Sequence, residues 1–258
     1  MTDKPQPLLR SNRELRADKI WNWTLPAWYV RIEGKVVKTC PNAGVCAQLC
    51  YARNGTYLFA NVKAAHLRNL NLVRETPELF VEMINAELQK PRFKESGESR
   101  YEKLSQFGKL VNDEWAVDWL KRGGSAVRIH DSGDFFSREY LNLWIRIAEA
   151  NPLILFYAYT KEVEMLKQTE LPVNFRIIYS KGGLQDELID DEVDRHADVF
   201  PDLVTLEVAG YTDQEASDLL AVLLETNKVG IVANNISHFR KKQGEKTFAE
   251  LALKSDNH

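Results

Sequence analysis

The chain has 258 residues, of which 44% are hydrophobic and 28% charged, a composition typical of folded globular proteins. This length suffices for a buried core without disulfide bonds, and we predict a single α/β domain over residues 1–258. The formal net charge of −3 excludes a protein whose whole surface is built to neutralise phosphates. The first twenty residues lack the apolar core of a signal peptide, so we expect a cytoplasmic protein with no membrane partner.

The first predicted β element spans residues 28–38, as a strand or as a hairpin around Gly34. All three cysteines follow it, at Cys40, Cys46 and Cys50. An odd number of cysteines in a cytoplasmic chain speaks against a disulfide framework. Thiolates are soft donors that select zinc or iron–sulfur centres, so we predict a metal or cluster loop over residues 39–51.

Three thiolates from one loop leave one coordination position free. On a tetrahedral zinc ion that position takes water or a fourth protein ligand, for which His66 is the candidate. On a four-iron cluster it leaves one iron open to a small molecule. Three buried structural cysteines are a further interpretation, and the spacing alone leaves these alternatives open.

Two helices are predicted next, over residues 52–74 and 77–89, the second starting after an N-cap at Thr76 and a proline at its first position. Residues 91–106 are rich in Lys, Arg and Glu, and we predict a charged loop or insertion there.

Beyond residue 125, short β-rich runs alternate with helical patterns. The predicted strands are 126–130, 153–159, 173–179, 203–208 and 229–233. A capping box from Thr212 to Glu215 predicts a helix over 216–224. Together with the strand at 28–38 this makes about six strands, so we predict an α/β fold with a partial or complete parallel (βα) barrel.

The turn after the predicted strand 126–130 holds a second candidate site. Asp131 and Asp134 offer carboxylates to an amine, a ribose or a hard cation, and Gly133 permits close backbone approach around Ser132. Helix capping alone also explains such a turn. His130 would ligate, relay a proton or simply pack.

Other strand ends carry weaker signals. Residues 157–161 place Thr160 and Lys161 near the predicted mouth, and the backbone amides of 179–183 would meet a carboxylate or phosphate. We predict a solvated helix face or loop for the acidic stretch 186–198, with metal binding as the alternative.

Three stretches, WNWTLPAWY, TCPNAGVCAQLCYARNGTY and VRIHDSGDFFSREYLNLWIRIAEANPLILFYAYTK, together resemble the phage and plasmid family named after gene product eighty-eight of a mycobacteriophage. The resemblance covers residues 10–180 and implies a phage protein in the cytoplasm of a bacterial host. It implies no activity.

A more distant similarity links the chain to radical S-adenosylmethionine enzymes, which place a cysteine loop after the first strand and a glycine-acidic motif after a later one. This similarity implies that Cys40, Cys46 and Cys50 hold a [4Fe-4S] cluster whose open iron binds S-adenosylmethionine. Asp131, Ser132, Gly133 and Asp134 would line its methionyl amine. The spacing C-x5-C-x3-C departs from the usual C-x3-C-x2-C of those enzymes.

Three functions therefore compete. The first is an iron–sulfur enzyme that needs an electron donor and acts on an unknown substrate, nucleic acid or protein. The second is a zinc-stabilised protein that binds nucleic acid or a host protein through short basic clusters such as 240–242. The third is a divalent-metal hydrolase that uses Asp131, Asp134 and His130.

Overall fold

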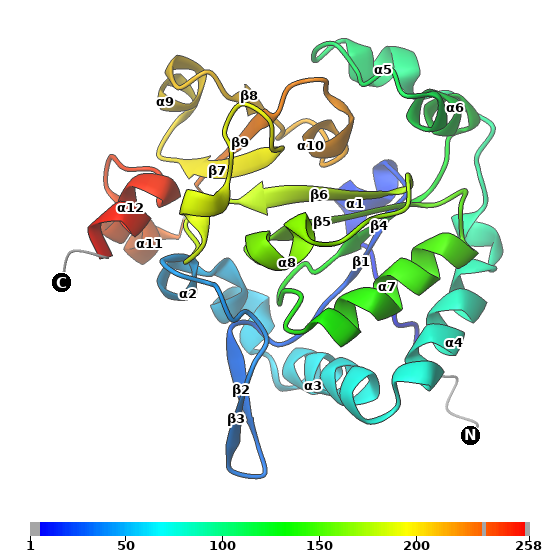
Figure 1. The fold of residues 1–258 in the computed structure, drawn as a ribbon, viewed down its shortest axis with the longest axis horizontal. Helices are drawn as coiled ribbons and strands as arrows, with labels where there is room; N and C mark the ends of the chain where they lie inside the picture. Colours follow the sequence, from blue (N-terminus) through cyan, green and yellow to red (C-terminus); the bar gives the residue numbers. More distant parts are fainter. Residues whose placement is uncertain (1–5, 234–235, 256–258) are drawn as a thin grey trace.

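A computed structural model describes residues 6–233 and 236–255. Its centre is a seven-stranded sheet in which all neighbouring strands are parallel (Figure 1). In order across the sheet the strands are β1 (Ile20–Trp23), β4 (Ala126–Ile129), β5 (Leu155–Thr160), β6 (Phe175–Ser180), β7 (His196–Phe200), β9 (Lys228–Val232) and β8 (Thr212–Asp213). The predicted α/β class is confirmed. Among the described residues no ladder joins β1 to β8, so the sheet does not close into a complete barrel.

The helices include several short 3-10 turns, labelled η. They are α1 (Arg13–Ala17), α2 (Cys46–Leu49), η1 (Tyr51–Arg53), η2 (Gly55–Leu58), α3 (Ala60–Glu75), α4 (Pro77–Leu88), η3 (Pro91–Phe93), α5 (Tyr101–Ser105), α6 (Glu114–Arg122), α7 (Arg138–Ala150), α8 (Val163–Lys167), η4 (Asp186–Leu188), α9 (Leu203–Val208), α10 (Leu220–Leu223), α11 (Ser237–Gln243) and α12 (Phe248–Ser255). In the described parts of the chain, none is long and apolar enough to cross a membrane.

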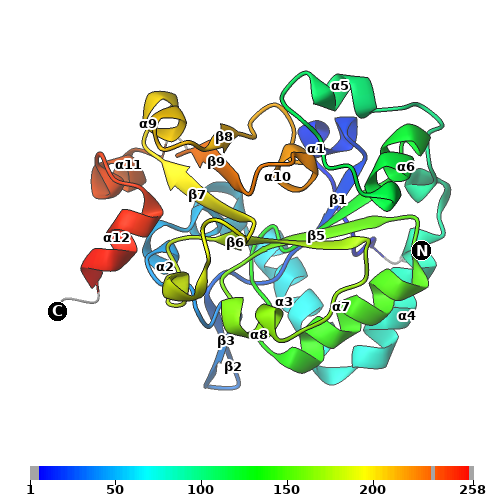
Figure 2. The ribbon, with the colours of Figure 1, turned by 45° about the horizontal axis from the view of Figure 1, so that its top comes forward.

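Helices cover both faces of the sheet (Figure 2). One core joins a sheet face to α3, α4, α7 and α8, and the other joins the opposite face to α5, α6 and α10. Strand β5 illustrates the division, because Phe156 packs into the first core and its neighbours Leu155 and Tyr157 into the second. A parallel sheet buried on both faces accounts for the near-continuous apolar strands.

A hairpin of β2 (Tyr29–Ile32) and β3 (Lys35–Lys38) stands apart from the sheet and projects from the body of the molecule (Figures 1 and 2). Its turn residues Glu33 and Gly34 have φ values of 50° and 79°, the left-handed pair that a tight two-residue hairpin requires. The hairpin around Gly34 is thus confirmed, but it contributes no strand to the main sheet.

The cysteines consequently follow β3 and not the first strand of the sheet, which is β1. They lie in the long connection between β1 and β4. Cys46 opens α2, whereas Cys40 precedes this helix and Cys50 directly follows it. The charged segment 91–106 further along this connection carries η3 and α5, with Phe93 and Leu104 buried.

The strand predicted at 203–208 is wrong, because these residues form α9. The Asp202 carboxylate accepts a hydrogen bond from the Thr205 amide at 2.8 Å and caps the helix. Leu206 is buried there, whereas Val204 and Val208 are exposed. The strand that precedes α9 is β7, inside the stretch that its acidic residues marked as a helix face or loop.

The capping box at Thr212 is also wrong, since Thr212 lies in β8 and pairs with Val229 of β9. The Glu215 amide donates to the Asp213 carboxylate at 3.2 Å, and helical structure begins only at α10. Two polar residues at the right spacing therefore form a turn at the end of a strand.

Candidate functional site

One cavity of about 1280 Å³ opens at the carboxyl ends of the parallel strands. This is the position where parallel α/β folds place their ligands. All seven residues predicted from the sequence line it: Cys40, Cys46, Cys50, Asp131, Ser132, Gly133 and Asp134. Two segments that are more than 80 positions apart in the sequence thus meet at one site.

The three thiols are free and line this cavity. The Sγ atoms of Cys46 and Cys50 are hydrogen-bonded to each other, and Cys40 is close enough for its charge to act on Cys50. The Trp28 amide donates to Cys40 Sγ at 3.4 Å. Trp28 adopts a φ of 62°, and its carbonyl also accepts from the Cys40 amide at 3.2 Å.

The three thiols differ in pKa because their surroundings differ. The hydrogen bond from the Cys50 thiol lowers the pKa of Cys46, and the nearby Lys161 ammonium lowers it further. The same hydrogen bond raises the pKa of Cys50, and burial raises the pKa of Cys40 to about 12. Cys46 is therefore the first of the three thiols to lose its proton as the pH rises. The resulting thiolate is the form that binds metal.

Residues that follow β5 and β6 contact the cysteine segment and fix its position. Asn42 donates to the Glu162 carboxylate from its backbone at 3.2 Å and from its side chain at 2.7 Å. Gly44 packs so tightly on Gly182 and Gly183 that an added Cβ would lie 2.6 Å from the Gly182 oxygen. Neither Glu162 nor this glycine contact was predicted, because the chain separations are too large for a local motif to reveal them.

Asp134 joins the 131–134 turn to this segment. Its amide donates to the Thr39 carbonyl at 2.7 Å, next to Cys40. Its carboxylate accepts from the Thr160 hydroxyl at 2.6 Å and from the Lys161 amide at 2.9 Å. Burial raises the pKa of Asp134. Its carboxylate oxygens are thus already engaged in fixing the ends of β4 and β5.

Ser132 and Gly133 have packing roles in this turn. The Ser132 hydroxyl donates to the Leu25 carbonyl at 2.5 Å. Gly133 has a φ of 91°, and a Cβ there would lie 2.7 Å from Leu25 Cβ. Glycine is therefore required by its conformation and by close contact with Leu25, in addition to any approach of a ligand.

Asp131 belongs to an aromatic group that the sequence did not indicate. Its carboxylate accepts hydrogen bonds from the Tyr57 and Tyr51 hydroxyls. The Tyr51 hydroxyl also donates to the Asp131 carbonyl. His66, the candidate fourth zinc ligand, packs against Tyr57 with ring centroids 5.9 Å apart. Among residues 6–233 and 236–255, no three His, Cys, Asp or Glu side chains form a group spaced for a single metal ion.

His130 is buried and also lines the cavity. Its Nε2 lies 2.8 Å from the Tyr140 hydroxyl, and its ring contacts Phe135. Burial lowers the pKa of His130 to about 3, so the ring is neutral at pH 7. Its other ring nitrogen, Nδ1, is buried and has no hydrogen-bond partner among the described residues.

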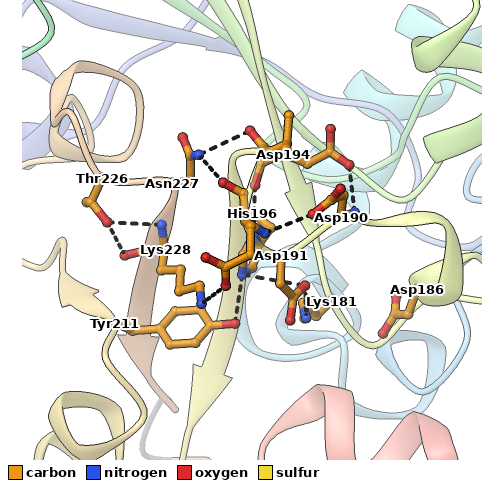
Figure 3. Close-up of polar contacts among 12 residues, drawn as sticks. Lys181, Asp186, Asp190, Asp191, Asp194, His196, Tyr211, Thr226, Asn227 and Lys228 are labelled. Carbon is orange, nitrogen blue, oxygen red and sulfur yellow. Dashed lines mark hydrogen bonds and ion pairs between the residues drawn. The ribbon is translucent and has the colours of Figure 1, made fainter.

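The acidic stretch is bonded to the glycine loop and to nearby lysines, and Figure 3 shows its contacts with Lys181 and Lys228. The amides of Gly182 and Gly183 donate to Asp186 at 2.6 and 2.9 Å, so a carboxylate of the same chain takes the predicted anion position. Lysines neutralise other acids, with Lys181 pairing with Asp191 at 2.5 Å. Lys167 pairs with Asp194 and Lys228 with Glu192. Between η4 and β7 this stretch is therefore an ion-paired loop.

Two further walls complete the cavity. Phe239 and Phe248 of the C-terminal helices form an apolar cluster with Val45 and Leu49, which covers α2. On the opposite side, the Arg128 guanidinium lies 3.3 Å from the Asp218 carboxylate and over the Tyr159 ring. Asp218 and the C-terminal helices come from segments without a recognisable motif, so the sequence did not indicate them.

Comparisons with known proteins confirm the resemblance to the family named after gene product eighty-eight. The Gene 88 protein of Mycobacterium phage L5 is 27% identical over 124 residues, which cover 48% of this chain and 43% of the phage protein. No solved structure matches. The sequence profile of the family described as Gene product 88 matches residues 6–255. The chain therefore belongs to the Gene product 88 family.

Proposed function

We propose that this protein binds an iron–sulfur cluster through Cys40, Cys46 and Cys50, with one iron open to the cavity. The observation that carries the proposal is that three free thiols of one segment line a large cavity. The donor set fits the group, because thiolates are the usual ligands of such clusters. The Trp28 amide that points at Cys40 Sγ is also the type of hydrogen bond that tunes them.

We further propose that S-adenosylmethionine occupies the cavity and that the sheet acts as a partial barrel around it. The order of the motifs supports this assignment. The cysteines lie between the first and second strands of the sheet, and the turn 131–134 follows the second strand. Radical S-adenosylmethionine enzymes, which the sequence resembles, have the same order. A bound cluster would supply one-electron reduction, so an electron donor is required.

The residues around the cavity would bind and orient its ligand and would shield it from water. Lys161 places a positive charge near Cys46 and favours its thiolate. Asp134 fixes the turn, and Asp131 presents a carboxylate at the cavity wall. The apolar cover from Phe248 excludes water on the thiol side. Arg128 offers hydrogen-bond donors to a substrate at the opposite wall.

The zinc and hydrolase alternatives receive less support. His130 and Asp134 are engaged in packing and backbone contacts, so they do not converge with Asp131 on a common point. His66 faces Tyr57 and does not line the cavity.

The test is anaerobic purification and reconstitution, followed by iron, sulfide and zinc analysis and an absorption spectrum. We expect about four irons per chain with matching sulfide. The variant Cys46→Ala should lose the iron, because one of three soft ligands is removed. Gln48→Ala is the matched control, since Gln48 is an exposed residue of the same helix. One zinc without iron, or full iron in Cys46→Ala, would refute the proposal.

A further inference from the structure

Residues 28–74 carry an unusual charge for a chain with a net charge of −3. They include seven basic residues and one acid, Glu33. The basic residues are Arg31, Lys35, Lys38, Arg53, Lys63, Arg68 and Arg74. All seven are exposed, and none forms an ion pair with any residue that the structure describes. Elsewhere lysines and arginines commonly pair with acids, so this segment keeps its positive charge available.

The hairpin sorts its residues onto two faces. Val30, Ile32 and Val37 pack against the first core. The other face is exposed, and on it Tyr29 lies opposite Lys38 and Arg31 opposite Val36. Directly opposed residues of an antiparallel pair share a face. The solvent face of the hairpin is therefore basic and aromatic.

A line of contacts leads from this face to the cavity. The Tyr29 ring lies edge-on to Trp28 with centroids 4.8 Å apart, and the Arg53 guanidinium lies 4.8 Å from the Trp28 ring. Arg53 ends η1, which begins at Tyr51, a residue that lines the cavity. We call Arg31, Lys38, Tyr29, Trp28, Arg53 and Tyr51 the basic–aromatic strip.

We propose that the basic–aromatic strip binds single-stranded nucleic acid and leads it to the mouth of the cavity. Phosphates would lie on Arg31, Lys38 and Arg53, which neutralise backbone charge. Bases would stack on Tyr29, whose side chain is 40% exposed. Stacking requires unpaired bases, which favours a single strand over a duplex and over an acidic peptide.

This inference goes beyond the cluster and does not depend on it, because none of the three thiols belongs to the strip. The probe is a fluorescent oligothymidylate of about 20 nucleotides, with a duplex of equal length and polyglutamate as competitors. Binding is measured by anisotropy between about 50 and 200 mM salt. The full-length protein is used as purified and as Cys46→Ala, which should bind the probe equally well.

The double variant Arg31→Ala/Lys38→Ala should weaken single-strand binding at least tenfold and reduce the salt slope by about 1.4, the value for two lost phosphate contacts. Tyr29→Ala should weaken binding with an unchanged slope, because stacking releases no counterions. Lys90→Ala/Lys121→Ala removes equal charge from exposed positions outside the strip and should change affinity less than twofold. Circular dichroism confirms that each variant is folded.

Three results would overturn the inference. The first is no binding at the lowest salt. The second is an equal loss of affinity in the Lys90/Lys121 control, which would show general attraction by positive charge. The third is equal or better competition by the duplex or by polyglutamate, which would assign the strip to a different partner.

Discussion

Gly44 is the residue at which the cysteine segment packs most closely on its neighbours. It combines a φ of 52° with a backbone contact that leaves no room for a methyl group. Gly34 in the hairpin turn has a φ of 79° but open space around it. Replacing each glycine by alanine therefore distinguishes two costs. At Gly34 only the backbone conformation is unfavourable, whereas at Gly44 the close packing adds to it.

We expect Gly34→Ala to lower the free energy of unfolding by about 1 kcal/mol, the cost of a left-handed conformation. Gly44→Ala should lower it by roughly 2 to 4 kcal/mol, because overpacking adds to that cost. Urea denaturation measures both. Equal losses in the two variants would contradict the close packing of the cysteine segment on Gly182 and Gly183.

His130 should make stability depend on pH. Burial lowers its pKa from 6.5 to about 3, so between these values the unfolded chain binds a proton that the folded chain does not. This contribution to stability is present above pH 6.5 and is lost as the pH falls. Relative to His130→Asn, the wild type should lose up to about 1.4 kcal/mol per pH unit below pH 6. Parallel stability curves would show that His130 titrates normally.

At the scale of elements, Asp198 links β7 to α12. Its Oδ1 accepts from the amides of Val199 at 2.7 Å, Phe248 at 3.1 Å and Ala249 at 3.3 Å. Burial nevertheless raises the pKa of Asp198 from 3.8 to about 6. Helix α12 is thus attached to the sheet through an acid that takes up a proton at a higher pH than a free aspartate does.

The sign of this pH effect is opposite to that of His130. Between pH 3.8 and about 6 the folded chain binds the extra proton, so stability falls as the pH rises through this window. Relative to Asp198→Asn, the wild type should lose up to about 3 kcal/mol between pH 4 and pH 7 in urea titrations. Asp202→Asn is the control, because the Thr205 amide lowers the pKa of this exposed helix cap and reverses the sign.

The elements that the sequence predicted are those with a clean local signal. Gly34 indicates the hairpin, and apolar runs indicate β4, β5, β6 and β9. Strand β7 was missed because its polar residues suggest a surface, although His196 and Asp198 are buried and bonded to distant partners. Hydrogen bonds between buried polar groups and residues far away in the chain produce no periodic pattern in the sequence.

At the scale of the whole molecule, the C-terminal helices pack on the segment that carries the thiols. Phe248 lines the cavity and packs in the cluster that covers α2. We expect Phe248→Ala to increase the rate at which a bulky aromatic disulfide reagent modifies the metal-free protein by about tenfold. Leu253→Ala, at a position 72% exposed on the same helix, should leave the rate unchanged. Equal rates would mean that the reagent enters past another wall.

The sequence predicted those residues of the candidate site that follow β strands along the chain. Cys40, Cys46 and Cys50 meet the 131–134 turn at one cavity, as parallel strands that end at one edge require. The parts that support them, Glu162 and the C-terminal helices, come from segments whose contacts depend on the assembled fold. Local spacing therefore predicted the reactive groups and missed the residues that position and cover them.

The position of the cysteines between β1 and β4 has a consequence for the order of assembly. Ile20 pairs with Ala126 across the entire cysteine connection, whereas β4, β5 and β6 pair with neighbours that are closer in the chain. Closing the longer loop costs more entropy, so we expect β1 to dock late. Until then the thiols have no finished cavity around them. Delivery of a metal would compete with air oxidation during that interval, and the yield of loaded protein would depend on how the chain is folded.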